Sequence, residues 1–146
     1  MRFIKSFCLM FFVMFAATAQ AAEPVYQNGG VAVGGFDVVS YHRMQNPVAG
    51  NPELTHEWQD VTWRFADETN RRLFVADPEK FAPRYGGYCA YALAKGALAP
   101  TDPEAWTIYH GKLYLNFSKS VRKKWLADVA NHVSKADGNW PQILDQ

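Results

Sequence analysis

The stretch Tyr85-Gly86-Gly87-Tyr88-Cys89-Ala90-Tyr91 combines two adjacent glycines, three tyrosines and a cysteine. Adjacent glycines adopt backbone angles that residues with a Cβ atom avoid, so another chain segment or a ligand can approach them closely. Tyrosine suits the lining of a groove, because it offers apolar surface with a polar tip. We therefore predict that a ligand is bound by Tyr85, Gly86, Gly87, Tyr88, Cys89 and Tyr91. The alternative is a structural Gly-Gly turn followed by a cysteine that packs as a small apolar residue.

Two similar segments flank this stretch. Residues 54–58 and 61–66 surround the polar pair Gln59-Asp60, and residues 106–109 and 112–117 surround His110-Gly111, so that each segment has the pattern of a β-hairpin. The fold class predicted from them is α+β, with a small antiparallel sheet built from two β-hairpins and with helices packed mainly on one face. The segments also align with each other at an offset of 51 residues, which an internal duplication or a shared hairpin-helix pattern would explain.

Capping residues mark the predicted helices. Asp67 and Ser118 follow the two hairpins, Asp37 precedes a short apolar turn, and Asp77 precedes a proline at a first helical position. A further short helix is predicted over residues 90–94, ended by Gly96. Apolar residues recur every fourth position after Ser118, which predicts one long helix closed by Gly138; they are Val121, Trp125, Val129 and Val133.

The N-terminus has the pattern of a secretory signal peptide over residues 1–21. Arg2 and Lys5 precede an apolar run at residues 7–17, and Ala19-Gln20-Ala21 is a small-residue cleavage signal. The run is shorter than the roughly 20 residues that a membrane-spanning helix needs. We therefore expect cleavage near Ala21, a periplasmic or secreted protein, and no membrane span after cleavage. Residues 22–34 are predicted to form an N-terminal arm, and residues 35–146 the folded domain.

The remaining 125 of the 146 residues are about the usual size of one domain. Arg2 and Lys5 leave with the signal peptide, so 13 basic residues remain against 14 acidic ones, and this balance argues against nucleic acid as a partner. Of the two cysteines only Cys89 remains, which excludes the class of small exported domains stapled by internal disulfides.

Several motifs resemble those of the exported YHS-domain proteins of bacteria, and the match covers nearly the whole chain after residue 21. They are Gly35-Phe36-Asp37-Val38-Val39-Ser40-Tyr41, Trp63-Arg64-Phe65-Ala66 with Asn70 and Phe74, Asp77-Pro78 through Tyr85-Gly86-Gly87-Tyr88-Cys89-Ala90, and Gly111-Lys112-Leu113-Tyr114-Leu115-Asn116. The resemblance implies a compact domain related to the TRASH metal-sensing domains and linked to heavy-metal handling. The metal-associated YHS domains, however, carry cysteines where this chain has Phe65, Ala66 and Asn70.

Three functions follow as hypotheses. The first is a non-catalytic module that handles a copper or zinc ion; the metal ligands to test are Cys89, His42 and Met44, since a soft ion such as Cu(I) favours Cys, Met and imidazole. The second is a module that binds a small molecule or a protein without metal. The third is a thiol enzyme with Cys89 as nucleophile, for which the chain has no recognisable Cys-His-Asn spacing.

Overall fold

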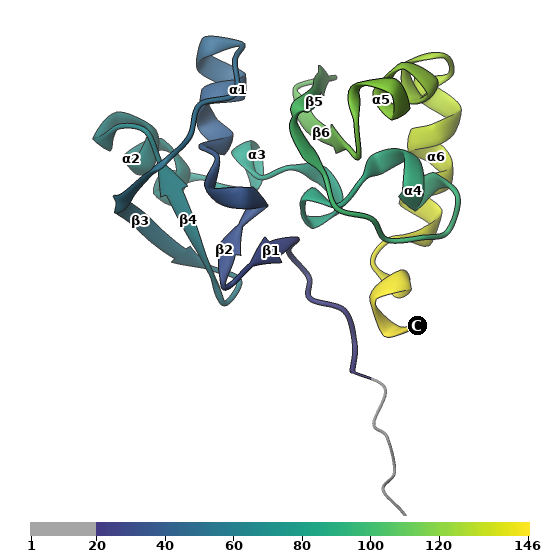
Figure 1. Cartoon of the computed structure of the whole chain (residues 1–146), viewed down its shortest axis with the longest axis horizontal. Helices are drawn as coiled ribbons and strands as arrows, with labels where there is room; N and C mark the ends of the chain where they lie inside the picture. The colour runs from purple at the N-terminus through teal and green to yellow at the C-terminus, as the bar shows by residue number, and fades with distance from the viewer. Residues whose placement is uncertain (1–19) are drawn as a thin grey trace, which may run out of the picture.

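The structure is a computed structural model that describes residues 20–146 (Figure 1). The predicted signal peptide lies almost wholly outside these residues. The predicted α+β class is confirmed, but the two hairpins belong to separate sheets, a four-stranded one and a two-stranded one. Within residues 20–146, no helix has the length and apolar character that crossing a membrane requires.

The first half of the chain forms a mixed sheet with the strand order β1-β2-β4-β3. The predicted hairpin is present, with β3 (Asn51–Trp58) antiparallel to β4 (Val61–Phe65). The segment 22–34, predicted to be an arm, adds β1 (Gln27–Asn28) and β2 (Val31–Ala32). Because β2 pairs with β4 in parallel, this sheet is not purely antiparallel as predicted. Residues of the same segment also enter the core; they are Val25, Ala32 and Val33.

Three helices complete the first half, and each begins where a capping residue predicts it. The Asp37 carboxylate accepts hydrogen bonds from backbone amides of α1 (Val38–Met44), and Asp67 does so for α2 (Glu68–Ala76). Asp77 caps α3 (Pro78–Phe81), in which the proline takes the first position. These caps satisfy amides that have no partner inside a helix.

The second half contains the hairpin β5 (Asp102–Tyr109) and β6 (Lys112–Asn116) and the short helix α4 (Ala90–Ala94). The single long helix predicted after Ser118 is wrong, because the chain forms α5 (Lys119–Leu126) and α6 (Val129–Asn139). Asp128 separates them with non-helical backbone angles. The turn lets α6 pack along α4, where the side chains of Val129 and Val133 join the core around Trp125.

The two halves repeat one architecture. Strand β5 begins and ends 51 residues after β3, β6 begins and ends 51 residues after β4, and α5 begins 51 residues after α2. Both hairpins shift register at the same place, after Asn51 and after Asp102. At these two residues the side chain accepts a 2.9 Å hydrogen bond from the amide two residues further on. Such detail favours internal duplication over a shared hairpin-helix pattern.

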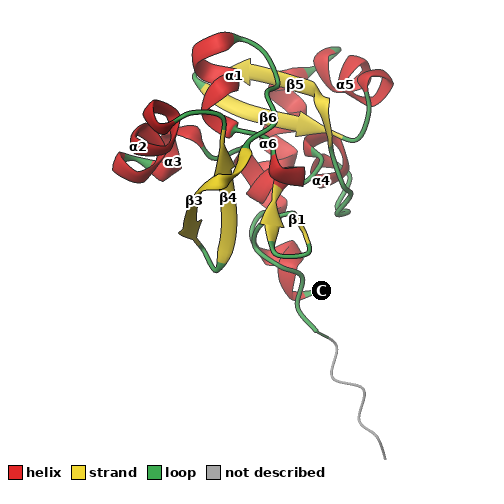
Figure 2. Ribbon diagram, turned by 60° about the vertical axis from the view of Figure 1, so that its left-hand side comes forward, coloured by secondary structure: helices red, strands yellow, loops and turns green. Residues whose placement is uncertain are grey.

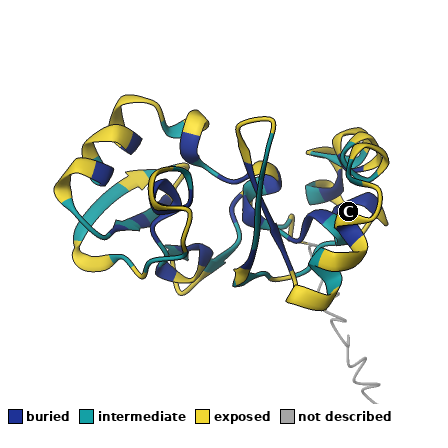
Figure 3. Cartoon of the chain, turned by 90° about the horizontal axis from the view of Figure 1, so that it is seen from above, coloured by how far each residue is buried: buried dark blue, intermediate teal, exposed yellow. Residues whose placement is uncertain are grey.

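One strand connects the two cores. Leu113 and Leu115 of β6 lie in the core of the first half, whereas Tyr114 between them lies in the core of the second half. This is the alternation that a β-strand imposes on successive side chains. The second sheet therefore lies between two buried layers, rather than carrying helices on one face (Figures 2 and 3).

The two ends of the described chain are paired. The amide of Ala22 donates a 2.9 Å hydrogen bond to the carbonyl oxygen of Leu144, which lies in the last short helical turn, η3 (Gln142–Asp145). Both segments lie on the same side of the molecule (Figure 1).

Candidate functional site

Cys89 is buried at the start of α4 in the second half. Its side chain is 1% exposed, and its sulfur accepts a 3.2 Å hydrogen bond from the Phe117 amide and lies 3.5 Å from Asn116 Oδ1. The thiol thus has polar neighbours but no route to solvent in this conformation. These contacts favour a structural role for this cysteine over a role as a reactive thiol.

The position of Cys89 corresponds to that of Asp37 in the first half. Each precedes the first helix of its half, and each accepts the amide that follows the last hairpin strand, that of Phe117 for Cys89 and that of Ala66 for Asp37. Asp37 is fully buried and also accepts from the Nδ2 amide of Asn70 at 2.7 Å. Both residues therefore have the same structural role: each connects the start of a helix to the end of a hairpin.

The glycine pair does allow a close approach, but the approaching residues belong to the protein's own N-terminal segment, 22–34. A Cβ atom on Gly86 would lie 1.9 Å from the carbonyl oxygen of Pro24, and one on Gly87 would lie 2.5 Å from a Val33 methyl group. Tyr26 also donates its amide to the Gly86 carbonyl at 2.9 Å. The glycines are therefore required by packing within the chain.

The three tyrosines of the predicted site contact different parts of the protein. The Tyr85 hydroxyl donates to Asp137 of α6 at 2.9 Å, and the Tyr88 hydroxyl donates to the backbone carbonyl of Glu23 at 2.8 Å. Tyr91 instead packs against the ring of His132. Only Tyr85 and Gly86 of the six predicted ligand-binding residues line the pocket described below.

The three candidate metal ligands are not brought together. His42 and Met44 lie on α1 in the first half, while Cys89 precedes α4 in the second, and Figures 1 and 2 show these helices apart. Met44 is 46% exposed, whereas His42 packs edge-on against Phe81. Over residues 20–146 there is no group of three His, Cys, Asp or Glu side chains arranged to hold a metal ion.

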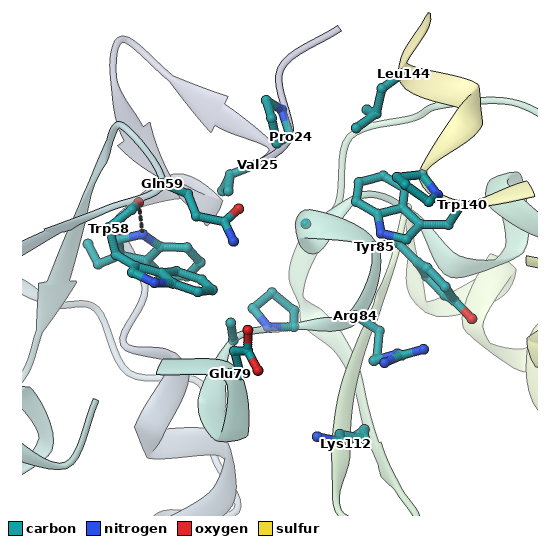
Figure 4. A pocket seen from close by; sticks show the side chains of 15 residues that line it. Pro24, Val25, Trp58, Gln59, Glu79, Arg84, Tyr85, Lys112, Trp140 and Leu144 are labelled. Atoms are coloured by element: carbon teal, nitrogen blue, oxygen red, sulfur yellow. Dashed lines mark hydrogen bonds between the residues drawn. The ribbon is translucent and has the colours of Figure 1, made fainter. Parts of the chain in front are cut away.

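A pocket of about 610 Å³ lies between the two halves. Figure 4 shows Trp58 on one wall and Trp140 with Tyr85 on the opposite wall. Its lining comes from the β3–β4 turn, the segment after α3, the N-terminal segment, the start of β6 and the C-terminal turn: Pro24, Val25, Trp58, Gln59, Trp63, Glu79, Ala82, Pro83, Arg84, Tyr85, Gly86, Lys112, Trp140, Pro141 and Leu144. This volume is within the range of about 300–1,000 Å³ that is usual for small-molecule sites.

Both aromatic walls are held in place by further rings. Trp58 packs against Trp63 at 5.7 Å between ring centroids, and the Trp63 indole donates to the Trp58 carbonyl at 3.0 Å. On the other side Trp140 packs against Tyr85 at 6.2 Å and against Tyr88 at 6.4 Å. The walls are thus largely preformed, which lowers the entropy cost of ordering them around a ligand.

Charged groups gather at the end of the pocket away from Pro24 and Leu144, where Figure 4 shows Glu79, Arg84 and Lys112. Arg84 is partly neutralised by Asp137, at 3.2 Å, and lies over the Tyr85 ring. Burial and the Asp137 carboxylate raise the pKa of Tyr85 well above its ordinary value. This phenol is protonated at neutral pH, and its hydroxyl already donates to Asp137.

Sequence patterns gave little indication of most of these lining residues. Trp58 and Gln59 belong to an ordinary hairpin end, and Trp140 belongs to a C-terminal turn, so neither spacing nor motif joins them. Only folding brings the two tryptophans to facing walls. Comparison of the chain with family models, with curated proteins and with solved structures finds no match, so the functional argument rests on the geometry of this pocket.

Proposed function

We propose that this protein is an exported, YHS-type, non-catalytic binding module that takes a small molecule into the pocket between its halves. The observation that carries the proposal is the pocket itself, with its facing tryptophans and a few charged groups at one end. The lining surface is about equally polar and apolar, so it offers both aromatic contact area and polar groups that can orient a ligand.

Two further observations favour binding without metal over the other hypotheses. The sulfur of Cys89, the candidate nucleophile and metal ligand, is buried and does not line the pocket. The aromatic rings that do line it supply contact area and have few rotamers to lose on binding.

The test is a screen of small aromatic compounds by ligand-observed NMR, followed by calorimetry. We expect hits that Ala82→Trp abolishes, because the new indole would fill the pocket. Ala130→Trp, on the exposed surface of α6, is the matched control and should bind normally. Leu144→Trp is a second blocking variant, and far-UV circular dichroism checks that each variant is folded. Hits that bind both blocking variants unchanged would contradict the pocket proposal.

Export is tested separately. Expression of the full chain in a Gram-negative bacterium should place the protein in the periplasmic fraction with an N-terminus at or near Ala22. An intact N-terminus on protein that stays in the cytoplasm would contradict this part of the proposal.

A further inference from the structure

We infer that the ligand is a small zwitterion with an aromatic side group, for which a free aromatic α-amino acid is the simplest example. This inference rests on the proposed binding function and names the class of ligand. It is drawn from three features of the pocket: its facing aromatic walls, the presence of both signs of charge at one end, and the absence of an ion-pair partner for one charge of each sign.

The aromatic part of the ligand would lie between Trp58 and Trp140. These residues lie on opposite walls, and each is only partly buried, so part of each ring is available to a ligand (Figure 4). Each indole also packs against rings of its own wall, Trp58 against Trp63 and Trp140 against Tyr85 and Tyr88. A flat ring that packs against either indole gains stacking or edge-to-face contacts worth about 0.5–1.5 kcal/mol beyond the area that it buries.

The charged end offers one group of each sign without an ion-pair partner. The ion pairs among residues 20–146 are Arg71–Glu68 and Arg84–Asp137, so neither Glu79 nor Lys112 takes part in one. Both line the pocket, and both are exposed to solvent. A ligand that carries an ammonium and a carboxylate on the same carbon would satisfy both, whereas a simple anion or a simple cation would leave one unused.

The pairing of Arg84 indicates which cation binds the ligand carboxylate. Since its guanidinium already donates to Asp137 and lies against the Tyr85 ring, its charge is partly compensated. Lys112 has no such neighbour within salt-bridge distance in the described chain, so it is the stronger attractor for the ligand carboxylate. The ammonium group is then directed toward Glu79.

The experiment compares four probes by calorimetry on the full folded protein: L-phenylalanine, L-alanine, phenethylamine and 3-phenylpropionate. The last three lack the ring, the carboxylate and the ammonium group, respectively. We expect L-phenylalanine to bind at least about 10-fold more tightly than each of the others, because a hydrogen bond to a charged group contributes about 1.5–3 kcal/mol.

Two pocket variants separate the charges. Lys112→Gln should weaken the binding of L-phenylalanine about 10-fold or more and leave the affinity for phenethylamine unchanged. Glu79→Gln should weaken the binding of L-phenylalanine and leave the affinity for 3-phenylpropionate unchanged. Lys123→Gln, on the solvent-exposed side of α5, is the matched control and should change nothing.

The outcomes distinguish the inference from the function on which it rests. If the three ring compounds bind equally well and Ala82→Trp blocks them, the pocket is a binding site but the zwitterion inference is overturned. If none of the four probes and no compound of the aromatic screen binds, both fail. Pairing of Lys112 with Glu79 in the free protein, seen as a mutual loss of their NMR pH titrations in the two variants, would also overturn the inference.

Discussion

Asp37 shows how much a single buried side chain holds in place. Its two carboxylate oxygens accept hydrogen bonds from the amides of Val39, Ser40 and Ala66 and from the side chain of Asn70. One residue thereby starts α1 and fixes α1 to the end of β4 and to α2.

We predict that Asp37→Ala lowers the free energy of unfolding by about 3 kcal/mol, because it removes a helix cap and leaves buried donors unsatisfied. Urea denaturation followed by circular dichroism measures this. Asp128→Ala is the control, since Asp128 precedes α6 without a side-chain capping bond, and its effect should stay within about 0.5 kcal/mol. Equal effects in the two variants would contradict the role given to Asp37.

The burial of Cys89 predicts a slow thiol. In a Cys8→Ser background, the folded protein should react with Ellman's reagent far more slowly than free cysteine, because the sulfur is 1% exposed. The same protein in urea should react at the ordinary rate. A folded-state rate equal to that of free cysteine would restore the thiol-enzyme and metal hypotheses.

His42 predicts a pH dependence of stability. Burial lowers its pKa in the folded protein, and the charges of Lys80 and Lys112 act in the same direction, against a backbone hydrogen bond with Phe81. The unfolded chain therefore binds the proton more tightly, and stability falls as the pH drops below about 6.5 toward the lower folded value. His42→Gln should lose less stability between pH 7 and pH 5 than the wild type. His110→Asn, at an exposed turn, should behave as the wild type does.

At the scale of elements, the decisive contact is between the N-terminal segment before β1 and the Gly-Gly turn. The predicted close approach at Gly86 exists, yet the segment that makes it was expected to be an arm outside the domain. Pro24 and Tyr26 instead cross the turn and connect the first residues of the domain to the second half.

Gly86→Ala should therefore destabilise the protein by roughly 3 kcal/mol or more, because the new methyl group would displace the backbone of Pro24 in addition to the strain of a positive φ. Gly96→Ala isolates the strain, since Gly96 also has a positive φ but open space around it. Thermal unfolding of both variants gives the difference. A Gly86→Ala protein no less stable than Gly96→Ala would show that the contact of the N-terminal segment with this turn contributes little to stability.

Local signals predicted the elements well, and non-local contacts explain what they missed. Period-two alternation around Gln59-Asp60 and the caps at Asp67 and Ser118 are properties of neighbouring residues, and the structure has the elements that they predict. The break at Asp128 depends on α6 packing along α4, which four-residue spacing does not encode. The pocket needs Trp58 and Trp140, residues that only the tertiary fold brings to facing walls.

For the whole molecule, β6 links the two halves. We predict one cooperative unfolding transition, with tryptophan fluorescence and far-UV circular dichroism giving coincident curves, because Leu113 and Tyr114 of one strand belong to different cores. Leu113→Ala should lower stability by about 2–4 kcal/mol without splitting the transition. Two separated transitions would instead mean that each half folds by itself.

The hydrogen bond between Ala22 and Leu144 also indicates how the order of segments in this chain can be changed. Ends that lie this close can be joined by a short linker, and new ends can be opened at an exposed loop such as that around Gly96. A circular permutant of this kind would place β5, β6, α5 and α6 ahead of the first half in the gene, with α4 at the new C-terminal end, and would leave their arrangement in space unchanged.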